Sequence, residues 1–165
     1  MQSALINRDR VQGGRRVWAG VWLLLTMILL AQTAQAQPER CYVRDGVAIK
    51  GYDPVAYHRE GKARKGDSTH QASYDDAVWH FVSAENRALF EEEPAKYAPA
   101  YGGYDAFFMA EDRRARVDPE DFMLHEGRLF LFKDRGAMSV FRQDLARNIA
   151  KADYWYQQFC NELGG

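Results

Sequence analysis

The side chains best suited to chemistry in this sequence are four histidines and two cysteines. The histidines stand at positions 58, 70, 80 and 125, and no two have the His-x-x-x-His spacing that places two metal ligands on one helix face. A histidine at the surface, or hydrogen-bonded within the fold, is the common structural interpretation. The chain also lacks a glycine-rich phosphate loop and a Gly-x-Ser-x-Gly elbow. Residue spacing therefore predicts no metal centre and no activated serine.

A tight turn is the second candidate, and it leads into a predicted helix from Asp105 to about Ala110. The turn residues are Tyr101, Gly102, Gly103 and Tyr104. The positive end of the helix dipole stabilises a carboxylate at the first position of such a helix. In one interpretation Asp105 only caps the helix. In the other its carboxylate faces a pocket and binds a hard cation or a cationic ligand.

His58 and His80 complete the candidate ligand-binding set, because both lie on predicted strands and the fold could bring them to Asp105. A carboxylate beside an imidazole can act as a general acid or base. The same residues therefore suit either a binding site or a catalytic one. A raised Asp105 pKa inside a closed pocket would favour catalysis.

The N-terminal segment has the pattern of a targeting signal. Arg15 and Arg16 precede an uncharged apolar stretch, and Ala34-Gln35-Ala36 has the small-x-small form that signal peptidase reads. We expect residues 1–36 to be a signal peptide and residues 37–165 to form a periplasmic or secreted domain. A retained membrane anchor is the alternative, although the strongly apolar part is shorter than the roughly 20 residues that span a bilayer. Both the general and the twin-arginine export routes remain open.

The two cysteines, Cys41 and Cys160, stand near opposite ends of the predicted mature domain. In an exported protein an even pair predicts a disulfide. A redox-active pair would need a closely spaced motif such as Cys-x-x-Cys, which this chain does not have. The expected bond ties the two ends of the domain together.

Composition excludes several classes of protein. The 165 residues are 47% hydrophobic and 13% aromatic, which is enough for a core and argues against intrinsic disorder. The formal net charge is −1 and no long Lys/Arg run is present, so a nucleic-acid partner is not expected. Removal of the signal peptide leaves an acidic domain with no stable membrane association.

Local patterns predict one α+β domain of short antiparallel strands and hairpins, with peripheral helices and a C-terminal helical segment. Strands are expected over residues 47–50, 55–58, 69–74, 77–82, 122–125 and 128–132. Helices are expected over residues 84–92, 94–97 and 105–110. An apolar stripe from Ala137 to Phe159 predicts a long helical segment with a break near residues 145–148. No internal repeat is evident.

Six blocks spread over the predicted mature domain carry a family pattern; they are Ala48–Tyr57, Trp79–Arg87, Pro94–Pro99, Tyr101–Tyr104, Val117–Glu120 and Asn148–Asp153. In these blocks the chain closely resembles exported YHS-domain proteins. The metal-associated YHS domains carry cysteines at positions that match Ala56, Val82 and Asn86. All three thiols are absent here, so this resemblance predicts no tetrahedral thiolate site.

The exported YHS branch usually has cysteine or selenocysteine directly after Tyr-Gly-Gly-Tyr. This chain has Asp105 there, which cannot perform thiol chemistry. We therefore expect a non-catalytic exported module that binds a small molecule or a metal ion at the turn. The alternative is an enzyme that uses Asp105 with His58 or His80 as general acid and base. A structural or partner-binding protein would instead expose a large apolar patch.

We predict that the exported protein contains a Cys41–Cys160 disulfide. Closing so long a loop stabilises the fold by about 4 to 5 kcal/mol in the chain-entropy model, so reduction should lower the unfolding midpoint. Thiol titration of the unreduced, denatured protein measures this directly. Two titratable thiols per chain would contradict the prediction.

Overall fold

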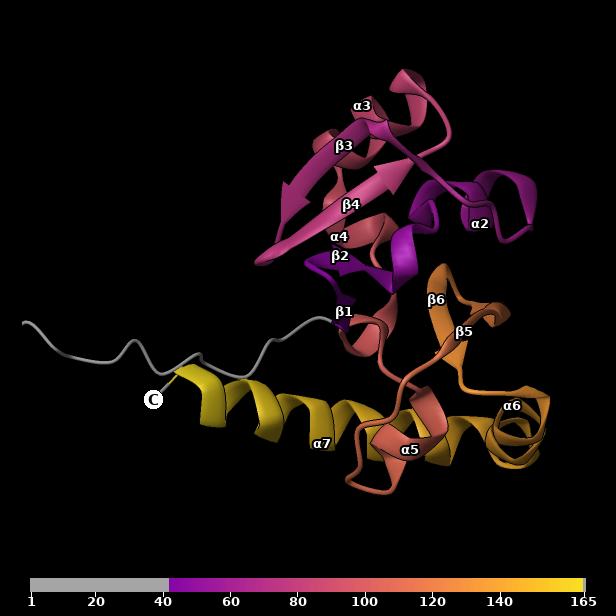
Figure 1. Cartoon of the computed structure of the whole chain (residues 1–165). Helices are drawn as coiled ribbons and strands as arrows, with labels where there is room; N and C mark the ends of the chain where they lie inside the picture. Colours follow the sequence, from indigo (N-terminus) through magenta and orange to yellow (C-terminus); the bar gives the residue numbers. More distant parts are fainter. Residues whose placement is uncertain (1–41, 165) are drawn as a thin grey trace, which may run out of the picture. The chain divides into compact units, whose positions relative to one another are not determined.

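The computed structural model describes residues 42–164, shown in Figure 1. The predicted signal peptide and Cys41 lie outside the described residues. Within residues 42–164 no helix combines the length and the apolar character needed to cross a membrane.

The predicted α+β class is confirmed. One sheet has four strands in the order β1-β2-β4-β3, with bounds Val43–Arg44, Val47–Ala48, Ala77–Phe81 and Asp67–Tyr74 respectively. The second sheet is the antiparallel pair β5 (Asp118–His125) and β6 (Arg128–Phe132). The helices are η1 (Ile49–Gly51), α2 (Pro54–Glu60), α3 (Ala84–Glu92), α4 (Pro94–Tyr97), η2 (Ala100–Gly103), α5 (Ala106–Ala110), α6 (Arg135–Gln143) and α7 (Leu145–Gly164).

Both predicted hairpins are present. In β4 the alternation places Trp79 and Phe81 in the core, at 1% and 0% exposure. The turn residues Asp75 and Asp76 have φ values of 50° and 59°, the left-handed region that a two-residue hairpin turn requires. The hairpin β5–β6 closes through Glu126 in the same region, with φ 50°.

The strand predicted over residues 55–58 is wrong, because this segment forms helix α2. Asp53 caps it: its Oδ1 accepts hydrogen bonds from the N–H groups of Val55 (2.8 Å) and Ala56 (3.2 Å). Pro54 occupies the first helical turn and Gly61 ends the helix in the left-handed region. Asp-Pro and Gly are typical of turns, but they equally mark the start and the end of a helix.

The predicted helices at residues 84–92, 94–97 and 105–110 are confirmed, with Asp105 as the N-cap of α5. Ser83 caps α3, since its hydroxyl accepts from the Asn86 N–H at 3.1 Å. The C-terminal apolar stripe forms two helices, α6 and α7. They separate at Asp144, one residue before the expected break.

The domain contains an internal repeat, contrary to our expectation. Repeat 1 runs from η1 to α4 and repeat 2 from η2 to α7, and each has the order turn, short helix, hairpin, helix, helix. Four positions of repeat 1 have a counterpart in repeat 2, and the same number of residues separates the two members of each pair. The pairs are the first hairpin-turn residue (Asp75, Glu126), the helix N-cap (Ser83, Asp134), a buried helix phenylalanine (Phe90, Phe141) and the helix C-cap (Glu93, Asp144). Both hairpins also carry a register irregularity at the same place. The visible sequence signal is short, a Gly-Tyr-Asp tripeptide that ends at Asp53 and again at Asp105.

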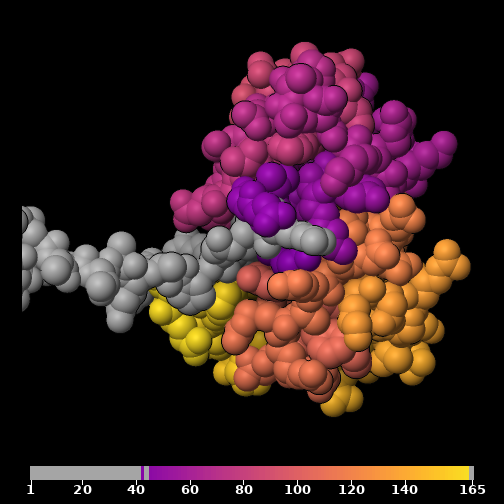
Figure 2. Space-filling view, in the orientation of Figure 1, coloured from indigo at the N-terminus to yellow at the C-terminus, as the bar shows by residue number. Residues whose placement is uncertain are grey.

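Strand β6 joins the hydrophobic clusters of the two repeats. Leu129 and Leu131 belong to the cluster around Trp79, whereas Phe130 and Phe132 belong to the cluster around Phe141. These four side chains have 0% exposure, whereas Arg128, the first residue of β6, is exposed. In Figure 2 the two repeats form the upper and lower parts of the visible surface. A strand buried on both faces therefore holds one repeat against the other.

Candidate functional site

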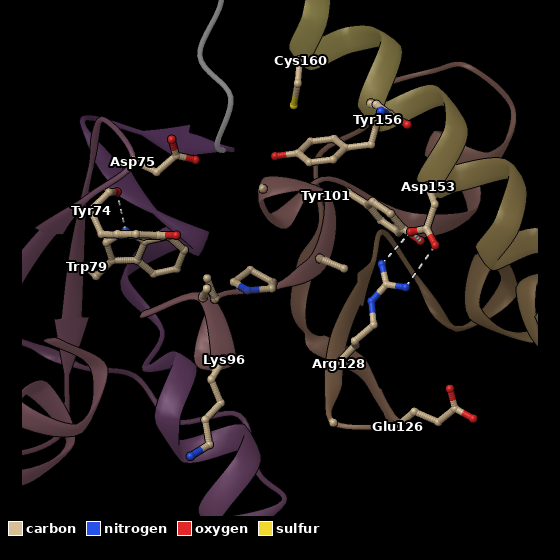
Figure 3. A pocket seen from close by; sticks show the side chains of 17 residues that line it. Tyr74, Asp75, Trp79, Lys96, Tyr101, Glu126, Arg128, Asp153, Tyr156 and Cys160 are labelled. Atoms are coloured by element: carbon tan, nitrogen blue, oxygen red, sulfur yellow. Dashed lines mark hydrogen bonds and ion pairs between the residues drawn. The ribbon is translucent and has the colours of Figure 1, made fainter. Parts of the chain in front are cut away.

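A cleft of about 610 Å³ lies between the two repeats (Figure 3). Both hairpin turns line it, with Asp75 from repeat 1 and Glu126 from repeat 2. The linker between the repeats contributes Pro99, and helix α7 lines the remaining side. The volume is in the range of small-molecule sites in proteins.

The repeat-1 wall has two aromatic residues, Tyr74 and Trp79, together with the charged residues Asp75 and Lys96. The Trp79 indole Nε1 donates a hydrogen bond to the Tyr74 carbonyl at 3.0 Å, and the Trp79 ring packs 5.3 Å from the ring of Phe90. The ring of Tyr74 also contacts Phe90, at 5.7 Å. These contacts hold the two aromatic residues of this wall in place without a ligand.

The repeat-2 wall carries a hydrogen-bonded network of three side chains. The Tyr101 hydroxyl donates to Asp153 Oδ1 at 3.0 Å, and Arg128 contacts the same carboxylate through Nη2 (2.6 Å) and Nη1 (3.2 Å). The Arg128 guanidinium also lies 5.6 Å from the Tyr101 ring centre. Burial, with the nearby Asp153 charge, raises the pKa of Tyr101, so its hydroxyl stays protonated and remains a donor.

Helix α7 presents one face to the cleft. Asp153, Tyr156, Gln157 and Cys160 follow the three- and four-residue spacing of a single helix face. The Tyr156 ring lies 5.7 Å from that of Tyr101. In Figure 3 the Tyr156 hydroxyl and the Cys160 sulfur both point toward the cleft.

The predicted glycine turn contributes Tyr101 and Gly102 to the cleft. Tyr101 has φ 58° and ψ 31°, an uncommon conformation for a residue with a Cβ. Gly103 cannot be replaced easily, since an added Cβ would lie 2.8 Å from Ile49 Cγ2 and its φ is 83°. The Gly102 carbonyl accepts a hydrogen bond from the Tyr42 N–H at 2.7 Å. The turn is thus fixed by the close approach of Ile49 and by the hydrogen bond from Tyr42.

Asp105 is fully buried and does not line the cleft. Its Oδ1 accepts from the Phe108 N–H at 2.8 Å and its Oδ2 accepts from the Lys133 N–H. Burial raises the pKa of Asp105, although the backbone hydrogen bonds oppose that shift. This geometry corresponds to the capping interpretation of Asp105.

The two candidate histidines lie elsewhere. His58 packs edge-on against the Tyr97 ring at 5.4 Å, and its buried Nε2 has no partner among the described residues. His80 lines a separate cleft on repeat 1. The structure therefore brings Tyr101 and Gly102 together with the cleft, and it distributes Asp105, His58 and His80 over three other places.

Sequence reasoning missed the polar residues of the cleft. Asp153 ends the YHS-like block Asn148–Asp153. No local sequence signal predicts its ion pair with Arg128, which lies in a different element. Tyr156 belongs to the apolar stripe, and such a stripe is typical of core residues and does not mark a ligand site. Only the register of α7 against the repeat-2 hairpin shows that these side chains meet.

Cys160 is half-buried at the cleft. Its predicted partner, Cys41, lies outside the described residues, so the disulfide stays a prediction. Tyr42, the next residue, is bonded to Gly102, which lines the same cleft as Cys160.

Two other classes of site find little support in the described part of the chain. No group of three or more His, Cys, Asp and Glu side chains in residues 42–164 is arranged to hold a metal ion. The large apolar side chains that are exposed, Leu124, Val140 and Tyr154, belong to three different elements. Single exposed apolar residues are ordinary on protein surfaces.

Comparisons of the chain with protein-family models, with curated proteins and with solved structures give no match.

We predict that Asp105→Asn destabilises the fold by about 2 kcal/mol, because both oxygens accept backbone N–H groups and an amide nitrogen cannot accept. Asp134→Asn is the matched control, since exposed Asp134 caps α6 through one oxygen only. Asparagine is as good an N-cap as aspartate, so this control should change stability little. Urea unfolding of both variants provides the test. Equal stability of the two would show that the second hydrogen bond of Asp105 contributes nothing.

We predict that His58 makes the fold less stable in mild acid. Burial lowers the pKa of His58 in the folded state below its ordinary 6.5, so the unfolded chain binds the proton more tightly. The stability of the neutral form is present above about pH 6.5 and falls as the pH drops below that value. Unfolding curves at pH 7.5 and 5.5 should therefore differ less for His58→Gln than for the native protein. The control is His70→Gln on strand β3; if it flattens the dependence equally, His58 is not the cause.

Proposed function

We propose that this protein is a non-catalytic module that binds a small organic molecule in the cleft between its repeats. The observation that carries the proposal is the combination, in one cleft, of aromatic side chains from both repeats with the preformed Tyr101–Asp153–Arg128 network. Small-molecule sites typically have this composition: mostly apolar walls and a few fixed polar groups.

The residues of the cleft suggest what the ligand looks like. Tyr74 and Tyr156 are half-buried and offer flat apolar surfaces, which suit a planar or aliphatic body, and Trp79 lies at the base of the same wall with 1% exposure. Arg128 has five N–H donors, and its contacts with Asp153 use one on each terminal nitrogen. The remaining donors can bind an acceptor oxygen or nitrogen of the ligand. The expected ligand therefore combines an apolar body with at least one hydrogen-bond acceptor.

Preorganisation supports binding at useful affinity. The network fixes Arg128, Asp153 and Tyr101, and the indole hydrogen bond fixes Trp79. Since these side chains are already ordered, a ligand does not have to immobilise them. Binding energy is then available for the contacts themselves.

Binding is favoured over catalysis because the acid–base pair of the alternative is not assembled. The Asp105 carboxylate is directed at backbone N–H groups, and His58 contacts Tyr97 instead. An organic ligand is favoured over a metal ion because Asp153 is already neutralised by Arg128. The six YHS-like blocks and the predicted signal peptide support a role in the periplasm or outside the cell, which is part of the proposal.

The test is a screen of a fragment library against the mature protein by protein-observed NMR. We expect a subset of fragments to shift the Trp79 indole signal and the Tyr101 and Gly102 amides. Tyr156→Ala should weaken these fragments about tenfold by removing one aromatic wall. Tyr154→Ala is the matched control, because Tyr154 is 55% exposed on the same helix and does not line the cleft.

Two outcomes would overturn the proposal. One is the absence of any fragment that shifts cleft signals at millimolar concentration. The other is equal affinity of the fragments for the native protein and for Tyr156→Ala, provided that the variant unfolds at a similar temperature.

A further inference from the structure

A second cleft, of about 450 Å³, lies on repeat 1 and shares no residue with the first. Its lining includes two lysines and one histidine, Lys50, Lys65 and His80, around the backbone of Gly51. These residues come from η1, from the segment before β3 and from β4. The fold therefore gathers three basic groups that are distant in sequence.

Among the ion pairs formed between described residues, none involves either lysine of this cleft. The Lys65 ammonium donates to the Lys50 carbonyl and lies 5.3 Å from the centre of the Tyr52 ring. Both of these partner groups are uncharged. In a domain that is acidic as a whole, the two lysines are a local concentration of positive charge.

Three acidic residues lie in or beside the cleft, and one of them belongs to its lining. Asp45 is the acidic residue of the lining, against two lysines. Asp67 lies on the neighbouring strand and interacts with His80 at longer range. Glu120 accepts a hydrogen bond from the Tyr52 hydroxyl at 3.3 Å and is not part of the lining. In the lining itself, two lysines outnumber one aspartate.

Gly51 is needed for this arrangement. Its φ is 75°, and a Cβ added there would lie 3.1 Å from His80 Nδ1 and 3.4 Å from Lys65 Nζ. Glycine therefore lets both basic groups approach the main chain. A side chain at this position would occupy the floor of the cleft.

Among the described residues, the corresponding place in repeat 2 has no such cleft lining, although the two repeats share the same order of elements. At the corresponding glycine, Gly103, the space is filled by the Ile49 side chain. The position that corresponds to His80 is Leu131, which is fully buried. Repeat 1 thus has an open basic cleft where repeat 2 has packed apolar groups.

We propose that the cleft formed by Lys50, Lys65 and His80 binds a small oxyanion of the phosphate type, either free or as the phosphate group of a small organic molecule. The two ammonium groups supply charge-assisted hydrogen bonds to the oxyanion, and the imidazole supplies a further donor. This site is independent of the small-molecule cleft between the repeats.

The experiment is a titration of the mature protein with inorganic phosphate, followed by NMR at pH 7, with sodium chloride at matched ionic strength as the control for general salt effects. We expect saturable shifts at Gly51, Lys65 and His80. Lys50→Met and His80→Gln should each weaken phosphate binding about tenfold. Lys62→Met is the matched control, because Lys62 is exposed and outside the cleft, and it should change affinity less than about twofold.

A second titration with glycerol phosphate distinguishes the two sources of the group: tighter binding than phosphate assigns the site to an organic phosphate, weaker binding to the free ion. The absence of saturation with both probes would overturn the proposal. Equal weakening by Lys62→Met would do the same, since it would show a general charge effect. Tyr156→Ala should leave phosphate binding unchanged, which separates this site from the proposed small-molecule function.

Discussion

Two buried carboxylates, one in each repeat, hold the elements of the repeats together. Asp53 and Asp105 are both fully buried, and each caps a short helix while its second oxygen accepts the N–H of the residue that follows a hairpin, Val82 or Lys133. A buried carboxylate is costly unless its oxygens are hydrogen-bonded, so this geometry is strongly constrained. Asn86 adds one more donor to Asp53 through its side chain, at 2.7 Å. Each carboxylate thus joins a turn, a helix and a hairpin.

The two glycine turns depend on this constraint. Each capping aspartate ends a Gly-Tyr-Asp segment. The glycine of that segment and the two residues before it have left-handed backbone angles. Because the aspartate fixes the end of the turn, the turn has one position relative to the hairpin. In repeat 1 the turn forms the floor of the basic cleft, and in repeat 2 it places Tyr101 against Asp153. The same element therefore supports both candidate sites, although the residues exposed to solvent differ.

The asymmetry between the repeats creates the larger cleft. Helix α4 has four residues and ends before Pro99, whereas α7, at the corresponding place, has 20 residues. The groups that α7 contributes to the cleft, Asp153 to Cys160, lie in the part that has no counterpart in repeat 1. Strand β6 contributes Arg128 to the cleft, and its next four residues pack into the hydrophobic clusters of both repeats. A duplicated scaffold and one extended helix together produce a concave surface.

The sequence by itself determined the hairpins, the helices capped by Ser83 and Asp105, the α+β class and the position of the Tyr101–Tyr104 turn before a helix, because alternation, turn residues and caps are local signals. It did not determine that residues 55–58 are helical, since the side chain of Asp53 decides between turn and helix through contacts with Val82 and Asn86 far along the chain. It also could not show that the Asp105 carboxylate is directed into the core, or that Arg128, Asp153 and Tyr101 meet. Those facts depend on packing between elements distant in sequence, and only the tertiary structure brings such elements together.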